Sequence, residues 1–338
     1  MQRPIVEEQD MLVRVSTGSA LTLGLASGLL DAGPTTLYLL TYHPGRCSAN
    51  CVFCSQAKTS SSKEDLLSRV TWPVFRLEEV LNALAKKSGQ VGRICVQAVN
   101  YANVIEDIVA IASHILSRIS IDVSVSCQPV DSGALHRLRH VGVDRISIPV
   151  DAVNPKLFDI LKGHAAGGPY SWQGHMNALR QAVSVFGAGR VTTHVIVGLG
   201  ETDRDVLEFI QEMADLGICP ALFAFTPIPG TRLEDRDPPP ISRYRLLQTA
   251  RYIIVNGLAR SEDMKFDASE ALVDLGVSRE ELRHVIESGL PYLTSGCPNC
   301  NRPFYNERPG GPLFNFPRPL NSLEIEEIER IVREGCRD

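Results

Sequence analysis

Three cysteines, Cys47, Cys51 and Cys54, form a Cys-x3-Cys-x2-Cys loop directly after an apolar run at 36–41. Three thiolates alone do not complete a tetrahedral zinc site, which needs a fourth ligand. His43 is the candidate for that fourth position, so zinc stays open as an alternative. An iron–sulfur cluster held by only three cysteines instead keeps one iron free to bind another molecule. The spacing therefore favours a redox cluster with an open iron.

The composition restricts where such a cluster would work. The chain has nine cysteines and begins with the acidic residues Glu7, Glu8 and Asp10, unlike a secretory signal or a transit peptide. This pattern favours metal ligation in a reducing compartment over a disulfide framework. A net charge of −5 provides no basic footprint for nucleic acid, and no apolar run is long enough to span a membrane. We expect a cytoplasmic protein with neither a nucleic-acid nor a membrane partner.

Short runs rich in Val and Ile alternate with segments of helical spacing. The expected strands lie at 36–41, 93–99, 122–127, 145–150, 191–197, 221–226, 264–267 and 292–295. The expected helices lie at 77–84, 104–118, 134–140, 175–185, 203–216, 243–255, 279–288 and 322–334. Such alternation predicts an α/β fold with a parallel sheet, which at this length closes most economically into a (β/α)8 TIM-type barrel.

The expected barrel occupies residues 35–300. Residues 1–34 are interpreted as an N-terminal leader with a helix laid across one end of the barrel. Residues 301–338 are interpreted as a C-terminal extension that packs on the barrel and follows a Cys-x2-Cys pair.

Residues that could do chemistry follow the predicted strands. Active sites of such barrels lie at the carboxyl ends of the strands, so these residues are expected to meet at one rim. They are the cysteine loop, Cys95 and Gln97, Cys127, Asp151, the group Gly198, Gly200 and Glu201, and finally Cys297 and Cys300.

Each of these residues also has a plain structural interpretation. Asp151 is equally suited to capping a helix or a loop. Gly198 and Gly200 would serve a tight turn, although a missing Cβ also lets a ligand approach the backbone. Glu201 precedes the predicted helix at 203–216 and would complement its positive end. Buried cysteines are often inert apolar residues.

The cysteine loop, with Phe53 between its second and third cysteines, resembles the signature of the radical S-adenosylmethionine (SAM) enzymes. The resemblance implies that Cys47, Cys51 and Cys54 hold a [4Fe–4S] cluster whose open iron chelates SAM. It also implies that Phe53 packs against the adenine. In this family an electron from the cluster cleaves SAM to a 5′-deoxyadenosyl radical, so the cofactors carry the difficult chemistry.

Three further stretches, at 143–151, 195–201 and 227–231, resemble the biotin-synthase branch of that superfamily. The resemblance covers most of residues 15–300. It implies that Asp151 binds the ribose hydroxyls of SAM. Gly198, Gly200 and Glu201 would lie against the adenine, and Gln97 is included among the cofactor contacts.

Biotin synthases hold a second cluster with three cysteines and an arginine. Cys95 falls on the first of those cysteines and Cys127 lies close to the second, but Thr192 and Glu270 stand where the third cysteine and the arginine are expected. Cys297 and Cys300 are therefore expected to join Cys95 and Cys127 in holding a second [4Fe–4S] cluster. Zinc, or no metal at all, remains an alternative for these four residues.

The segment 294–318 resembles the two-component lipoyl synthases, which work as a pair of paralogous subunits. The resemblance implies sulfur insertion into a protein-bound octanoyl chain, with an octanoylated carrier protein, a paralogous partner and an electron donor such as ferredoxin or flavodoxin. Single-chain lipoyl synthases carry an extra N-terminal cysteine motif, whereas residues 1–46 contain no cysteine. The alternatives are another biotin-synthase-like reaction on a small molecule and a non-catalytic iron–sulfur electron carrier.

Overall fold

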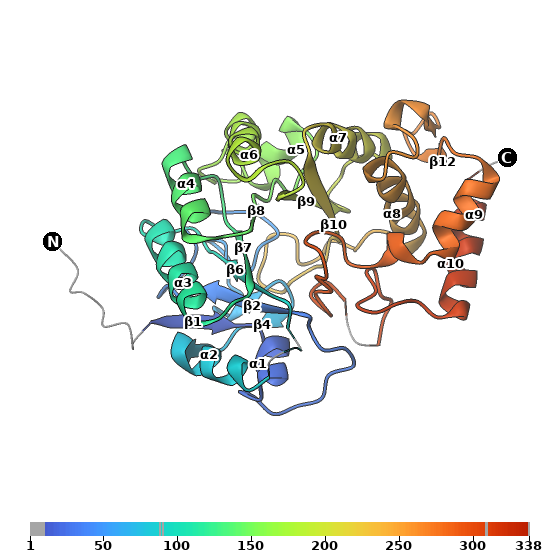
Figure 1. Ribbon diagram of the computed structural model, residues 1–338. Coiled ribbons are helices and arrows are strands. Elements are labelled where there is room, and N and C mark those ends of the chain that lie inside the picture. Colours follow the sequence, from blue (N-terminus) through green and yellow to red (C-terminus); the bar gives the residue numbers. More distant parts are fainter. Residues whose placement is uncertain (1–10, 88, 90, 308–309, 337–338) are drawn as a thin grey trace.

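An eight-stranded sheet with helices along its outer side organises the protein (Figure 1). The computed structural model describes residues 11–87, 89, 91–307 and 310–336. The strand order is β10–β9–β8–β7–β6–β2–β1–β5. The parallel strands are β2 (Thr36–Thr41), β6 (Arg93–Gln97), β7 (Asp122–Ser126), β8 (Arg145–Ser147), β9 (Val191–Val197) and β10 (Ile218–Ala224). The expected α/β class and parallel sheet are confirmed.

The connecting helices form because their apolar residues recur on one face and their ends are capped. In α2, for example, Leu77, Val80 and Leu84 are all buried at helical spacing. Asp131 caps α4 by accepting a hydrogen bond from the Ala134 amide. The helices are α2 (Leu77–Ala85), α3 (Val104–Arg118), α4 (Ser132–Val141), α5 (Pro155–Leu161), α6 (Trp172–Phe186), α7 (Asp203–Asp215) and α8 (Ile241–Val255). Of these, only α5 was not expected from the sequence.

The N-terminal stretch contributes a strand as well as a helix. Strand β1 (Leu12–Val15) pairs antiparallel with β2 on one side and with β5 (Val74–Arg76) on the other. Helix α1 (Thr17–Leu23) follows, shorter than the expected leader helix. Val13 and Val15 are fully buried, which explains why this segment joins the sheet instead of lying across its end.

The strands expected at 264–267 and 292–295 are not part of the main sheet, so the prediction of eight parallel strands is wrong, while closure into a barrel stays a prediction. Strand β11 (Lys265–Phe266) pairs antiparallel with β12 (Leu272–Asp274) in a separate sheet. Residues Leu290–Tyr292 form a 3-10 turn around Pro291, which has no amide to donate to a strand ladder.

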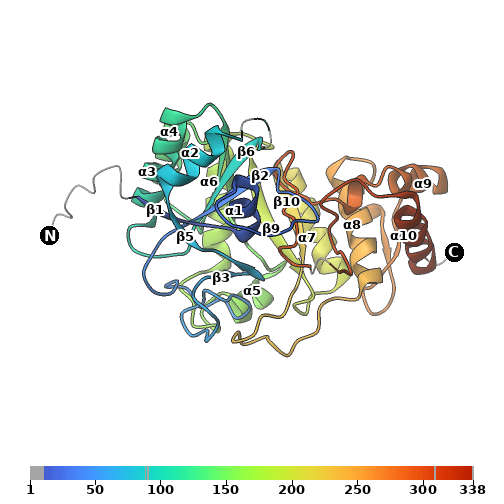
Figure 2. The same cartoon turned by 90° about the horizontal axis from the view of Figure 1, so that it is seen from below.

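A C-terminal strap, residues 294–307, lies beside β2 and β10 where further strands were expected (Figure 2). The Leu222 amide of β10 donates to Ser295 Oγ at 2.8 Å, and the Thr35 amide donates to Asn301 Oδ1 at 3.0 Å. At the carboxyl end of β10, Asn306 Nδ2 donates to Ala224 O at 3.1 Å, and near its start Cys219 Sγ donates to Gly296 O at 3.7 Å. These three hydrogen bonds attach the strap along β10.

The remaining elements lie outside the main sheet, and Leu67 of the first of them lines the cavity described below. They are β3 (Leu66–Leu67), β4 (Val70–Thr71), the turn Ser261–Asp263, α9 (Arg279–Glu287) and α10 (Ser322–Gly335). Helix α10 confirms the predicted helix at 322–334, and it packs on α8 and α9 through the buried Ile328 and Val332. Among the described helices, none combines the length and apolar character that a membrane crossing requires.

Gly230 supports the segment that follows the cysteine loop. Its carbonyl accepts from the Ser61 amide and from Ser60 Oγ, each at 2.9 Å. Its φ is +82°, and a Cβ at this position would lie 2.4 Å from Ser62 N. Gly257 has a similar φ of +67° but open space around it, which makes it a matched control.

We expect Gly230→Ala to destabilise the protein by about 2–4 kcal/mol, since backbone strain and overlap add. Gly257→Ala should cost only about 1 kcal/mol, from the strain alone. Urea unfolding of both variants measures the difference. Equal losses in the two variants would contradict the close approach at Gly230.

Candidate functional site

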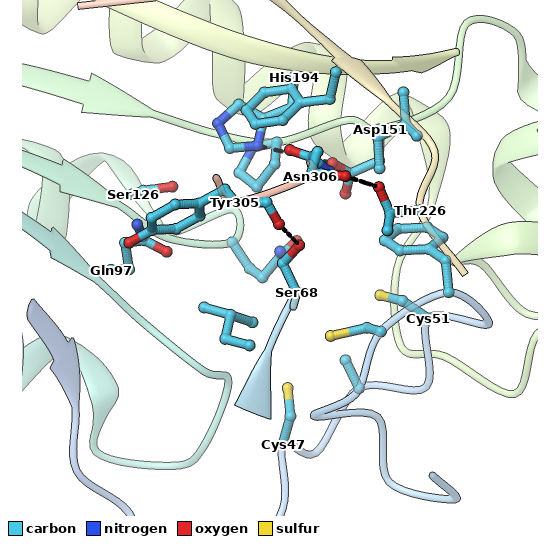
Figure 3. A pocket seen from close by; sticks show the side chains of 18 of the residues that line it. Cys47, Cys51, Ser68, Gln97, Ser126, Asp151, His194, Thr226, Tyr305 and Asn306 are labelled. Atoms are coloured by element: carbon cyan, nitrogen blue, oxygen red, sulfur yellow. Dashed lines mark hydrogen bonds and ion pairs between the residues drawn. The ribbon is translucent and has the colours of Figure 1, made fainter. Parts of the chain in front are cut away.

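One cavity on the inner face of the sheet brings together seven of the residues singled out in the sequence (Figure 3). It opens beyond the carboxyl ends of β6, β7, β9 and β10, as expected for a parallel sheet. The predicted residues that line it are Cys47, Cys51, Phe53, Cys54, Gln97, Cys127 and Asp151.

The cysteine loop is held mainly through its backbone, and the Asn100 amide also donates to Cys47 Sγ at 3.2 Å. The Val52 amide donates to Leu161 O at 2.9 Å, and the Val52 carbonyl accepts from the Arg232 amide at 3.1 Å. Figure 3 shows the sulfur atoms of Cys47 and Cys51 in the cavity. Burial raises the pKa of Cys51, and it raises that of Cys54 to about 12. Both thiols therefore stay protonated at neutral pH until a metal replaces the proton.

The surroundings of the loop fit an iron–sulfur cluster and a further ligand. Tyr170 lines the cavity at 9% exposure, and its hydroxyl is buried without a hydrogen-bond partner in the described protein. Such a group is costly to leave unpaired, so a bound ligand would satisfy it. Within the described residues, no three His, Cys, Asp or Glu side chains converge on a single metal-ion position. Each cysteine of a cluster binds a different iron, so a cluster needs no such convergence.

Asp151 lies in the cavity with an unusual backbone and a buried partner. Its φ is +69°, and its amide donates to His194 O at 2.9 Å. Its Oδ2 accepts from Lys162 Nζ at 2.7 Å, while Oδ1 is 3.9 Å from His194 Nδ1. Burial lowers the pKa of His194 to about 4, so the imidazole is neutral at pH 7. The Oδ1 atom is the side of this carboxylate that remains available to a hydroxyl donor.

Gly198, Gly200 and Glu201 are not among the residues that line the cavity. The Glu201 carboxylate accepts from the amides of Gly198 and Leu199 at 2.7 and 2.8 Å, and pairs with Arg243 at 3.0 Å. Gly198 has a φ of +105°, and a Cβ there would meet Pro239 at 2.9 Å. These contacts explain Gly198 and Glu201 as parts of the turn after β9, in which Gly200 has a positive φ of +120°. Their contact with a cofactor stays a prediction.

The four cysteines expected at a second cluster separate into a group of three and one apart. Cys95 pairs in register with Tyr38, whose hydroxyl lies 3.2 Å from Cys300 Sγ. Burial and the nearby thiols of Cys297 and Cys300 raise the pKa of Cys95 to about 12. Cys127 stands apart from these three and lines the cavity that the cysteine loop also lines. Burial alone raises its pKa to about 12.

Cys297 does not reach the rim at the carboxyl ends of the strands, where it was expected. The neighbouring Gly296 carbonyl accepts from Cys219 Sγ near the start of β10. Arg93 and Arg145, the first residues of β6 and β8, lower the pKa of the Cys297 thiol, although burial raises it overall. The strap therefore delivers Cys297 to the amino end of the strands and Cys300 nearer to Tyr38.

Several cavity residues were missed in the sequence. Arg302 of the strap lies over the Phe223 ring, with its guanidinium carbon 3.9 Å from the ring centre, and donates to Ser295 O. A strap without regular structure has no periodicity from which this placement could be predicted. His194 could have been found from the sequence. It stands two positions before the cavity residue Ile196 in β9, and residues two apart in a strand lie on the same face.

Two histidines, the buried His175 and the half-buried His194, make stability depend on pH. Burial lowers the pKa of His194 to about 4 and that of His175 to about 2, below the ordinary value near 6.5. Below about pH 6.5 the unfolded chain therefore binds more protons than the folded chain, and stability falls as the pH falls.

We expect His194→Gln to weaken this dependence in the cluster-free protein. Each histidine contributes up to about 1.4 kcal/mol per pH unit, so unfolding free energies measured in urea at about pH 6.5 and pH 5 should converge in the variant. An unchanged slope would mean that His194 is protonated in the folded state.

Comparison with known proteins places this geometry in a family. The radical SAM superfamily model matches residues 41–213, just over half of the chain. Biotin synthase from Acidithiobacillus ferrooxidans is 27% identical over 210 residues, covering 59% of this chain and 61% of that enzyme. Biotin synthase from Persephonella marina is 28% identical over 201 residues, covering 58% and 56%. The chain thus matches about three fifths of the length of these relatives.

Solved structures support the fold alone, since their sequences are distant. Methylornithine synthase aligns with a TM-score of 0.51 at 16% identity, over 65% of this chain and 62% of that one. The [FeFe]-hydrogenase maturase HydG from Carboxydothermus hydrogenoformans aligns with a TM-score of 0.50 at 17% identity, over 89% and 66%. The family match contains the whole cysteine loop, which lines a cavity fitted to a cluster and a second ligand. The chain belongs to the radical SAM superfamily of iron–sulfur, SAM-binding enzymes and is related to the biotin synthases.

Proposed function

We propose that this radical SAM enzyme inserts sulfur into an unactivated C–H bond of a protein-bound octanoyl chain. One observation carries the proposal: the inner face of the sheet holds two groups of thiols, Cys47, Cys51 and Cys54 at the cavity and Cys95, Cys297 and Cys300 below it. The first group suits the SAM-binding cluster. The second suits a further cluster that would supply sulfur, because its thiols lie near enough to one another for Cys297 and Cys300 to raise the pKa of Cys95.

The residues around the first group would bind and orient the cofactors. Cys47, Cys51 and Cys54 would hold a [4Fe–4S] cluster that, with SAM bound, supplies the 5′-deoxyadenosyl radical of this family. Asp151 would accept hydrogen bonds from the ribose through Oδ1. The Tyr170 hydroxyl would find its missing partner on the bound molecule. Phe53 and Gln97 line the same wall and would bound the nucleoside.

The cavity also suits an alkyl substrate. Its walls are largely apolar, with contributions from Leu67, Ala98, Ile196, Phe223, Phe225 and Ile228. An octanoyl chain offers only methylene groups, which such walls bind by burial. The strap covers this side, with Tyr305 and Asn306 lining the cavity. Excluding water there would protect a carbon radical from side reactions.

The second group of thiols, Cys95, Cys297 and Cys300, would hold a sulfur donor near this substrate. A carbon radical must meet its sulfur source at near-contact distance, which requires both to be held in one site. We assign the second [4Fe–4S] cluster to Cys95, Cys297 and Cys300. Cys127, the fourth candidate, lies apart from them in the cavity lining. The octanoylated carrier protein, a paralogous radical SAM subunit and a ferredoxin or flavodoxin donor in the cytoplasm complete the proposal.

The first test addresses the cysteine loop. Replacing Cys47, Cys51 and Cys54 with alanine should abolish reductive cleavage of SAM to 5′-deoxyadenosine while leaving the circular dichroism spectrum unchanged. The reason is that no other thiols line the cavity apart from Cys127 in the described structure. The reaction is run under anaerobic conditions and 5′-deoxyadenosine is measured by chromatography. Continued production by the variant would disprove this assignment.

The second test addresses the sulfur source. The double variant Cys297→Ala with Cys300→Ala should still cleave SAM but add no sulfur to an octanoylated carrier peptide. Cys336→Ala, at the end of α10, is the control and should behave like the unaltered protein. Mass spectrometry of the peptide and anaerobic iron quantitation give the readouts. About eight irons per chain in the unaltered protein and about four in the double variant are expected for two clusters.

Other outcomes separate the rival functions. Sulfur added by the double variant with about four irons would end the proposed sulfur source. SAM cleavage that is stimulated by a small molecule but not by the peptide would favour another biotin-synthase-like reaction. Iron without any SAM cleavage would favour an electron carrier.

A further inference from the structure

Lys162 is a buried cation that the reaction outlined above does not use. It follows directly after α5, and its side chain has 0% exposure. Its ammonium donates to Asp151 Oδ2 at 2.7 Å and to the Pro149 carbonyl. The ammonium also lies 5.7 Å from the centre of the Tyr170 ring. Lysine is almost never fully buried without a partner, so this position needs a reason.

The turn that carries Lys162 is fastened to the cysteine loop. The Leu161 carbonyl accepts from the Val52 amide at 2.9 Å, and the Ala166 carbonyl accepts from Asn50 Nδ2 at 2.8 Å. The turn closes tightly because Gly168 has no Cβ, which would overlap the Lys162 carbonyl. Lys162 thus links the loop that carries Cys51 to the carboxylate of Asp151.

The charges around Lys162 show what its removal would change. Lys162 and Asp151 together carry no net charge, whereas Asp151 alone would place a buried anion beside the cysteine loop. His194 faces Asp151 from β9 but is neutral at pH 7. The Lys162 charge also lowers the pKa of Cys51 and Cys54 against the larger effect of burial. Arg302 is the other cation that acts on His194, from the strap.

We propose that Lys162 is a positioning residue for SAM, which holds the Asp151 carboxylate with Oδ1 toward the cavity and balances the charge of that carboxylate beside the three-cysteine site. The proposal rests on the cluster and SAM binding of the family and not on the octanoyl substrate. It follows from the contact at 2.7 Å, the full burial of the ammonium and the attachment of its turn to the cysteine loop.

Binding of SAM to the cluster-loaded protein tests the first part. Titration calorimetry should show at least tenfold weaker binding for Lys162→Met. The double variant Lys162→Met with Asp151→Asn should bind no more than about twofold more weakly than Asp151→Asn alone, because Lys162 acts through Asp151. Lys265→Met, which breaks the exposed pair with Asp274 at 2.9 Å, is the matched control and should bind normally.

The reduction potential of the cluster tests the second part, which a purely structural role would not affect. Without SAM, Lys162→Met should lower the midpoint potential because it leaves the Asp151 charge unbalanced near the cluster. Adding Asp151→Asn should bring the potential back, with the iron content unchanged. Normal SAM affinity or an unshifted potential in iron-loaded Lys162→Met would overturn the proposal.

The double variant decides the question if Lys162→Met does not fold. Removing both partners of a buried pair leaves no uncompensated charge, so this variant should fold. A further tenfold loss of SAM binding relative to Asp151→Asn would then overturn the proposal. A failure to add sulfur in the unaltered protein would affect the proposed substrate alone, because SAM binding is measured without substrate.

Discussion

The site depends on one constraint: the backbone of the cysteine loop must be paired elsewhere so that its three thiols can line the cavity. Partners distant in sequence provide this. Arg232, 180 positions beyond Val52, donates its amide to the Val52 carbonyl and its guanidinium to the Asn50 carbonyl at 2.9 Å. Leu161 accepts from Val52 on the other side. Because buried backbone groups must be paired, these contacts determine where the loop can lie.

Two buried ion pairs near the ends of the strands have different consequences. Glu201 and Arg243 form a pair that lies outside the cavity and holds the turn after β9 through two backbone amides. Asp151 and Lys162 form a pair at the cavity wall, with one carboxylate oxygen directed away from the lysine. A buried pair is weak evidence for stability by itself, because desolvation offsets its attraction. The position of the second pair beside the cysteine loop is what gives it a functional interpretation.

The strap takes the place of the last two strands of the expected barrel. Its residues therefore lie at different heights along the strands of the sheet. Cys297 lies toward the amino ends of the strands, while Asn306 reaches the carboxyl end of β10. Arg302 lies between them against Phe223 and faces the cavity. A regular strand would have paired its backbone with β10 and alternated its side chains between two faces. The irregular strap instead brings Cys300, Arg302 and Tyr305 to the inner side of the sheet, while Pro298 and Asn299 are exposed.

The sequence alone was sufficient for most elements and for the principal chemistry. Strands β2 and β9 and helix α3 have the predicted bounds, because the strands are rich in β-branched and apolar residues and the apolar residues of the helix recur at helical spacing. The spacing of Cys47, Cys51 and Cys54 is local, so it indicated a cluster loop without any tertiary information. The loop's position after β2 followed from the rule for parallel sheets.

Only the tertiary structure decided which distant residues share the site. Glu201 looked like a cofactor residue by position, yet local amides and Arg243 occupy its carboxylate. Nothing in the sequence indicated Lys162, since a lysine after a short helix is ordinarily exposed. Its burial depends on its ion pair with Asp151. Cys297 was assigned to the wrong end because an irregular strap has no period from which direction can be inferred. Local patterns determine elements, whereas the pairing of buried charges and the course of irregular segments depend on contacts between residues far apart in the chain.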